Sequence, residues 1–76
     1  GTNVTSIGNS AFEKCIKLKK VTINSKKLTQ IGKKAFAGCK KLRSVVVKSK
    51  KVKKIGKGAF KGIHKKAVVK IPKRKK

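Results

Sequence analysis

A nine-residue pattern that occurs three times is the feature that most constrains how this chain can fold. Residues 7–15 read IGNSAFEKC, residues 31–39 read IGKKAFAGC and residues 55–63 read IGKGAFKGI. The Ile, Gly, Ala and Phe of this pattern recur at a spacing of 24 residues, whereas most positions between them vary. A fixed period of about 20 to 50 residues is typical of solenoids, in which each unit buries its apolar side against its neighbours. The period therefore predicts a stack of repeats.

The same period divides the chain into three units that follow a partial one. The partial unit covers residues 1–5, and the full units cover residues 6–29, 30–53 and 54–76, the last ending in a basic tail. Because the chain opens inside a unit and without an initiator Met, we expect it to be a piece of a longer protein.

Three segments of the chain alternate β-branched residues with other residues, which predicts short strands at 20–24, 44–48 and 68–72. Since they lie one period apart, they are expected to stack as a parallel sheet. Residues 28–31 and 52–55 predict a second, shorter ladder. Residues 9–14, 33–38 and 57–62 are predicted to form one or two helical turns each, with Ala and Phe facing inward.

Two residue types inside the pattern carry specific expectations. Gly8, Gly32 and Gly56 directly precede the predicted turns, where glycine suits a positive φ or a close approach of two backbones. The only aromatic residues are the three phenylalanines of the pattern, which are expected to form a continuous column inside the stack.

Pro72, which lies outside the pattern, cannot donate a hydrogen bond to a strand ladder and therefore suits the edge of a sheet.

These residues resemble a known family. The consensus Ile-Gly-x-x-Ala-Phe-x-x-Cys-x-x-Leu-x-x-Val-x-Ile closely resembles the bacterial leucine-rich repeat of the BspA type, over nearly the whole chain. Ile71-Pro72 matches the Ile-Pro often found at the strand end in that family. Two departures stand out: Lys66 replaces the leucine in the third unit, and Lys26 and Lys50 stand where other leucine-rich repeats have an asparagine.

The resemblance implies both a fold and a place of action. The implied fold is an α/β-type, right-handed leucine-rich-repeat solenoid with a short parallel β-sheet on the concave face and short helical turns on the other side. Proteins of this kind are bacterial cell-surface or secreted proteins, and some are adhesins. A cell-surface or extracellular location for this chain is an expectation from that resemblance.

The residue inventory argues against catalysis, metals and cofactors. The chain has no Asp, Tyr or Trp and one acid, Glu13, so it lacks a carboxylate pair or an oriented base. Cys15 and Cys39 share a repeat position that Ile63 fills in the third unit, which predicts two buried thiols, although a disulfide between adjacent units is possible. With His64 alone and distant, no closed metal site is expected.

The charge of the chain is extreme, because 25 Lys and Arg residues face one acid for a formal charge of +24. Such a chain attracts polyanions such as nucleic acid, an anionic wall polymer or a sulfated glycan at low salt. The lysines surround the predicted stack and no aromatic is left for base stacking, so a plain solvated surface is the competing interpretation. The candidate polyanion contacts are Lys26, Lys27, Lys50, Lys51, Lys73 and Arg74.

The outward side of the predicted long strands is comparatively poor in lysine, and repeat arrays commonly bind through such a surface. Val46 and Val68 are its best candidates for contact with a partner, although isolated surface valines need no explanation. We name these candidate partner-binding residues the strand face: Thr22, Asn24, Ser44, Val46, Lys48, Val68 and Lys70.

Three hypotheses about function follow from these surfaces. The first is a non-enzymatic module for protein interaction or adhesion through the strand face, with an unknown protein as its ligand. The second is non-specific polyanion binding by the lysine-rich surface, and the third is a purely structural spacer. No run of about 18 apolar residues is present, so no membrane insertion is expected. The chain is expected to be a monomer or a weak end-to-end oligomer, because charge repulsion opposes association.

Overall fold

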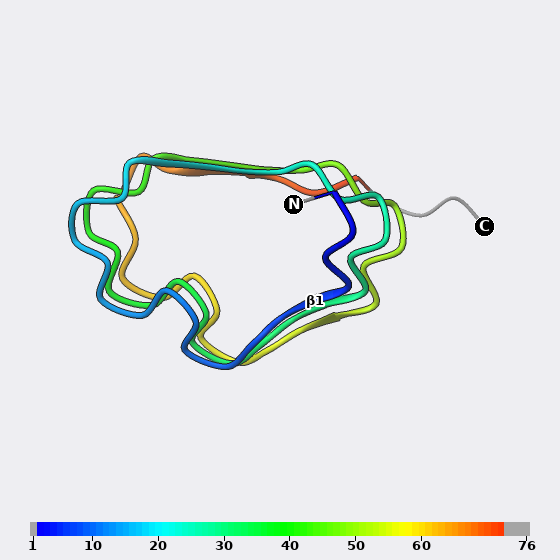
Figure 1. Ribbon diagram of the computed structural model, residues 1–76. Helices are drawn as coiled ribbons and strands as arrows, with labels where there is room; N and C mark the ends of the chain where they lie inside the picture. Colours follow the sequence, from blue (N-terminus) through cyan, green and yellow to red (C-terminus); the bar gives the residue numbers. More distant parts are fainter. Residues whose placement is uncertain (1, 73–76) are drawn as a thin grey trace.

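The computed structural model describes residues 2–72 and shows three coils of chain lying one over another (Figure 1). Each coil contributes one strand of two residues and one of three or four. The short strands are β1 (Ser6–Ile7), β3 (Gln30–Ile31) and β5 (Lys54–Ile55). The longer strands are β2 (Lys20–Ile23), β4 (Ser44–Val47) and β6 (Val68–Lys70).

The strands form two parallel three-stranded sheets, in the orders β1-β3-β5 and β2-β4-β6. Partners lie 24 residues apart throughout: Ile7 pairs with Ile31, and Val21 pairs with Val45. Both predicted ladders are therefore confirmed. Strand β6 ends at Lys70. In the coil before it, the Lys48 N–H continues the ladder to the Ile23 carbonyl, and Pro72, which occupies the matching position, has no N–H.

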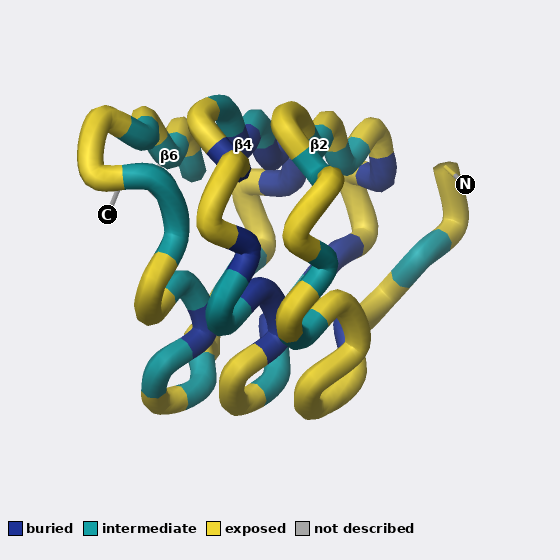
Figure 2. Tube along the Cα trace, turned by 90° about the vertical axis from the view of Figure 1, so that its left-hand side faces the viewer, coloured by how far each residue is buried: buried dark blue, intermediate teal, exposed yellow. Residues whose placement is uncertain are grey.

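The core lies between the two sheets and the turns, and its centre is a stack of aromatic rings. Phe12 and Phe36 have ring centroids 5.2 Å apart at 6° to each other, and Phe36 and Phe60 have centroids 5.5 Å apart at 2°. The expected column is thus confirmed. Only its middle member is fully buried, since Phe12 is 42% exposed on the first coil. Figure 2 shows the same gradient, with buried residues concentrated toward the middle of the stack.

The predicted helical turns are wrong, and with them the α/β-type fold class, because residues 2–72 contain no helix. In the first coil, Ala11, Glu13 and Cys15 instead donate to the carbonyls three residues earlier, as in successive β-turns. Ser10 and Lys14 interrupt any helix with φ of 58° and 61°. The turns also bond across coils, as the Phe12 N–H donates to the Ala35 carbonyl at 2.7 Å. The fold is a strand-rich repeat.

The glycines before the turns are explained by close backbone approach. A Cβ built on Gly32 would lie 2.5 Å from the Asn9 nitrogen, and one on Gly56 would lie 2.3 Å from the Lys33 nitrogen. At Gly8, on the first coil, nothing lies within 4 Å of that position. Only a hydrogen atom fits between stacked coils there, so the close-approach alternative holds for Gly32 and Gly56.

Two serines are buried at the corners that follow strands β2 and β4. Ser25 and Ser49 are both fully buried, although the adjoining lysines are exposed. The Ser49 hydroxyl donates to the Leu28 carbonyl at 2.6 Å and accepts from the Lys51 N–H at 3.0 Å. The Ser25 hydroxyl repeats this one coil earlier, toward the Val4 carbonyl and the Lys27 N–H. These hydroxyls link adjacent coils at the corner where other leucine-rich repeats have an asparagine and this chain has Lys26 and Lys50.

The two thiols differ in environment. Cys39 is fully buried and its Sγ donates to the Phe12 carbonyl at 3.0 Å, whereas Cys15 is only half-buried. Both are free thiols. The prediction of two buried thiols is confirmed for Cys39 and wrong for Cys15, which lies on a coil with a neighbour on one side only. Burial raises the pKa of the Cys39 thiol, and the hydrogen bond with the Cys15 backbone offsets only part of this rise.

Gly32→Ala is expected to destabilise the fold by roughly 2 kcal/mol or more, because the methyl group forces adjacent coils apart. The matched Gly8→Ala substitution is expected to leave the stability within about 0.5 kcal/mol of the original, since its Cβ meets no atom. Urea unfolding followed by circular dichroism measures both. Equal effects of the two substitutions would show that the close approach is not what requires glycine.

The free energy of unfolding is expected to fall, relative to that of Cys39→Val, as pH rises from about 8 to about 10. The pKa of Cys39 is higher in the folded chain than in the unfolded chain. The stability that the neutral thiol contributes is therefore complete below the unfolded-state pKa of about 8.5, and it is lost as pH rises through the folded-state pKa. Urea titrations under reducing conditions measure the difference between the two proteins at each pH. If the two free energies of unfolding differ by the same amount at every pH, the pKa of Cys39 is not raised by folding.

Candidate functional site

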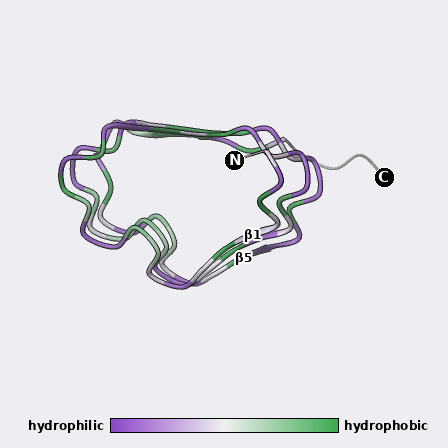
Figure 3. Ribbon diagram, viewed as in Figure 1, coloured by the Kyte–Doolittle hydropathy of each residue, from purple (hydrophilic) through white to green (hydrophobic). Residues whose placement is uncertain are grey.

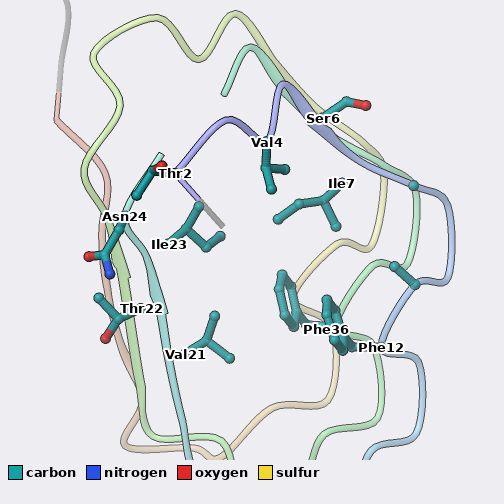
Figure 4. A pocket seen from close by; sticks show the side chains of 12 residues that line it. Thr2, Val4, Ser6, Ile7, Phe12, Val21, Thr22, Ile23, Asn24 and Phe36 are labelled. Atoms are coloured by element: carbon teal, nitrogen blue, oxygen red, sulfur yellow. The ribbon is translucent and has the colours of Figure 1, made fainter. Parts of the chain in front are cut away.

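The strand face lies on the outer side of the β2-β4-β6 sheet, where the 24-residue register aligns its members in rows. Thr22 pairs with Val46, and Val46 with Lys70. Ser44 pairs with Val68. Successive residues of a strand point to opposite faces, so Thr22 and Asn24 point outward while Val21 and Ile23 point inward, as Figure 4 shows. The fold thus brings the strand-face residues of all three coils onto one surface.

The centre of the strand face is uncharged. Val68 is 54% exposed, and Ser44 and Val46 are half-buried beside it. Val46 and Val68 are diagonal neighbours on adjacent strands, because Val68 pairs with the residue two before Val46. Three exposed lysines border this centre: Lys70 pairs with Val46, Lys20 pairs with Ser44, and Lys48 lies two residues beyond Val46. The result is a small patch of methyl and hydroxyl groups next to lysine side chains, a surface that can contact a protein partner without a charge at its centre.

The second candidate surface is the basic corner, which we define as Lys26, Lys27, Lys50 and Lys51. All four side chains are exposed, and they follow the longer strands of the first two coils. The backbone N–H groups of Lys27 and Lys51 bond to the buried serine hydroxyls, so the lysines of successive coils stand in two rows. Figure 3 shows this corner as mostly hydrophilic. Lys73 and Arg74 lie outside the described residues.

The electrostatics of this molecule are dominated by repulsion between like charges. A single carboxylate, Glu13, faces 25 cationic side chains in the sequence, so it can neutralise only a small part of them. Corresponding lysines of adjacent coils are separated by about one strand spacing, roughly 4.8 Å at the backbone. Rows of this kind favour binding of a polyanion, which supplies the missing negative charge.

Histidine and cysteine do not assemble into a reactive centre. His64 is half-buried, and its Nδ1 accepts a hydrogen bond from the Lys66 N–H at 2.9 Å. Sequence reasoning did not foresee this local bond. In residues 2–72 there is no group of three or more His, Cys, Asp or Glu side chains that could hold a metal ion. The same residues contain no helix that is long and apolar enough to cross a membrane.

A hollow at the open end of the first coil was not predicted from the sequence. It has a volume of about 420 Å³, and its walls include Val4, Ile7, Phe12, Val21 and Ile23 (Figure 4). On the second coil, which the first coil covers, the counterparts of Ile7 and Val21 are buried, with Ile31 1% and Val45 0% exposed. Gly8 also borders this hollow, and the described chain places nothing within 4 Å of a Cβ built on it.

Comparison with known proteins assigns the chain to a family. The model of the BspA-type leucine-rich repeat region, described as six copies, matches residues 1–76. No curated protein and no solved structure matches the chain. Proteins with BspA-type repeats are typically bacterial surface proteins, and the family indicates a repeat module for protein interaction. Because the match spans every residue, the chain belongs to the BspA-type leucine-rich repeat family.

Proposed function

We propose that this chain is a non-enzymatic adhesion or protein-interaction module of a bacterial surface or secreted protein, and that it binds a protein ligand through the strand face. The observation that carries this proposal is the uncharged centre of that face, with Val68 54% exposed beside Val46 and Ser44. Family membership supports an interaction role in general. The surface location of the parent protein rests on the family alone.

Three features of the strand face suit it to this role. Its backbone is held by hydrogen bonds on both sides at β4, the middle strand of the sheet. Its inner residues Val45 and Val47 are buried in the core, so the outer positions can vary without loss of the fold. Its centre of Ser44, Val46 and Val68 carries no charge, so this small area can be buried without desolvating a lysine, while exposed lysines border it.

A peptide ligand selected at high salt is expected to require the strand face. Random peptides displayed on phage would be selected against the chain in 0.5 M NaCl, where the Debye length is about 4 Å and contacts made only through lysine charges are weak. The double substitution Val46→Lys, Val68→Lys is expected to weaken the selected peptides at least tenfold, because it places two charges in the contact centre. Fluorescence polarisation measures the affinities.

The matched control for this experiment is Lys33→Gln, Lys57→Gln, which changes two exposed and stacked lysines on the turn side of the molecule. This variant is expected to bind the same peptides within twofold of the original affinity. Thermal unfolding of each variant checks that the fold survives. Peptides that bind equally well to the doubly charged variant would place the binding surface elsewhere.

A second function, polyanion binding, is favoured by the two rows of the basic corner. Exposed lysines one coil apart present regularly spaced charges to a linear polyanion, and the buried serines hold their backbone in place. Binding of this kind is driven by counterion release and weakens steeply with salt. Lysine is a hydrated point charge, which suits backbone phosphate or sulfate better than base recognition.

The polyanion function is tested with a short DNA duplex as the probe and with titrations at several salt concentrations. Lys50→Gln, Lys51→Gln is expected to lower the slope of log affinity against log salt by about 2, since each lost phosphate contact contributes about 0.9. The variant Lys33→Gln, Lys57→Gln serves again as the comparison and is expected to change the slope less. Equal losses in both variants would indicate attraction by net charge without a corner site.

A further inference from the structure

The two cysteines occupy equivalent places in adjacent coils. Each backbone N–H donates to the carbonyl three residues earlier, from Cys15 to Phe12 at 3.2 Å and from Cys39 to Phe36 at 3.3 Å. The two thiols are therefore carried by the same kind of hydrogen-bonded turn, one repeat apart. Because the coils stack in phase, the fold brings these turns next to each other.

The backbones of the two coils lie close together on both sides of the cysteines. A Cβ built on Gly38 would be 3.5 Å from the Lys14 Cα. With a carbon–carbon bond of about 1.5 Å, the Cα atoms of these two preceding residues are at most about 5 Å apart. Four residues beyond the cysteines the Arg43 N–H donates to the Lys19 carbonyl at 3.0 Å, so the coils are still in register. Disulfides join residues whose Cα atoms are about 4.4 to 6.8 Å apart, a range that suits this spacing.

The two side chains are also directed toward the same part of the core. The Cys39 Sγ donates to the Phe12 carbonyl at 3.0 Å, and the Cys15 N–H donates to that same oxygen. The buried sulfur of the second coil thus lies beside the backbone of the other cysteine, and Cys15 packs against the core cluster that includes Cys39. Loss of the Cys39 thiol proton leaves no orphaned group, since the Phe12 carbonyl keeps the Cys15 N–H as its donor.

We propose that Cys15 and Cys39 form a disulfide that joins the first two coils when the chain folds in the presence of a low-molecular-weight disulfide such as glutathione disulfide. One cysteine thiolate attacks a sulfur of the oxidant and displaces a thiolate. The other cysteine thiolate then attacks the protein sulfur of the mixed disulfide and displaces a second thiolate. Two electrons pass from the protein to the oxidant, and the two displaced thiolates take up the two protons that the cysteines lose.

The burial of Cys39 decides when the bond forms and how long it lasts. Cys39 is fully buried in the folded chain, so exchange takes place while the chain is folding, before the second coil is covered. The completed stack then shields the bond from reductants. Disulfides persist in oxidising compartments such as the outside of the cell, the location typical of proteins with this repeat. By closing a loop of one repeat, the bond constrains the unfolded chain and stabilises the stack.

Refolding the 76-residue chain from urea in equimolar reduced and oxidised glutathione tests the proposal. Intact mass spectrometry after alkylation of free thiols is expected to show an unalkylated monomer that has lost two hydrogen atoms. Trypsin digestion without reductant is expected to release residues 15–17 joined to residues 35–40. The equilibrium constant for forming the pair is expected to be at least about tenfold larger in the folded chain than in concentrated urea, because the bond and the fold stabilise each other.

Two variants with two thiols each serve as matched comparisons. Cys15→Val with Ile63→Cys moves the pair to the second and third coils, where a Cβ built on Gly62 would be 3.6 Å from the Gly38 Cα. This variant is expected to form the bond as completely as the original chain. Cys39→Val with Ile63→Cys leaves thiols two coils apart, roughly 10 Å at the backbone, and is expected to form no intramolecular bond. Circular dichroism under reducing conditions checks that each variant folds.

The oxidised original chain is also expected to unfold at a higher urea concentration than the reduced chain, since the cross-link restricts its unfolded state. Three results would overturn the proposal. The first is a folded chain that keeps two free thiols in the glutathione buffer, and the second is pairing that is equally complete in concentrated urea. The third is a bond between thiols two coils apart that forms as readily as the bond between adjacent coils.

Discussion

Backbone hydrogen bonding between coils is the constraint on which this structure depends. Each coil is bonded to the next through both sheets and through its turns, always between residues about one period apart, as in the bonds of Phe12 to Ala35 and Gly32 to Ile7. A single insertion within a coil would shift one ladder against the other. The 24-residue period is therefore kept because two sheets and a set of turns must stay in phase at once.

Core formation follows from that registration. Corresponding side chains lie over one another, so an apolar residue at one repeat position packs against the same position of its neighbours. The phenylalanine stack at 5.2 and 5.5 Å is the largest example, and the buried serines are its polar counterpart. Burial is complete only where a coil has neighbours on both sides, which is why Phe36 is fully buried while Phe12 is 42% exposed.

The same geometry that builds the core also arranges the surface. A lysine repeated at one position, as in Lys26 and Lys50, becomes part of a row, whereas the row of Thr22 and Val46 is uncharged until Lys70 on the third coil. With 25 cationic side chains and one acid, these rows repel one another, and the fold tolerates this because the charges lie on the outside of the coils in water. The strand face and the basic corner are thus two chemically different surfaces built by one repeat.

Much of this fold could be predicted because a repeat of 24 residues records the same environment three times. Alternating β-branched residues located the longer ladder, the matching segments 28–31 and 52–55 located the shorter one, and the recurrent phenylalanines located the column. The turns were mistaken for helices because alanine is a strong helix former and the apolar spacing there also fits a helical turn. The informative signal was glycine at equivalent positions of other units. Gly58 corresponds to Ser10 and Gly38 corresponds to Lys14, and all four residues have a positive φ.

The sequence by itself determined the period, the pairing of the strands, the aromatic column and the family, because each of these is written in the spacing of identical residues. Tertiary structure alone decided that Ser25 and Ser49 are buried and that Cys15 and Cys39 differ in exposure. It also decided that Gly8 faces open space while Gly32 does not. The physical reason is that these properties depend on whether another coil lies in contact, and residues that are equivalent in sequence differ in their neighbours.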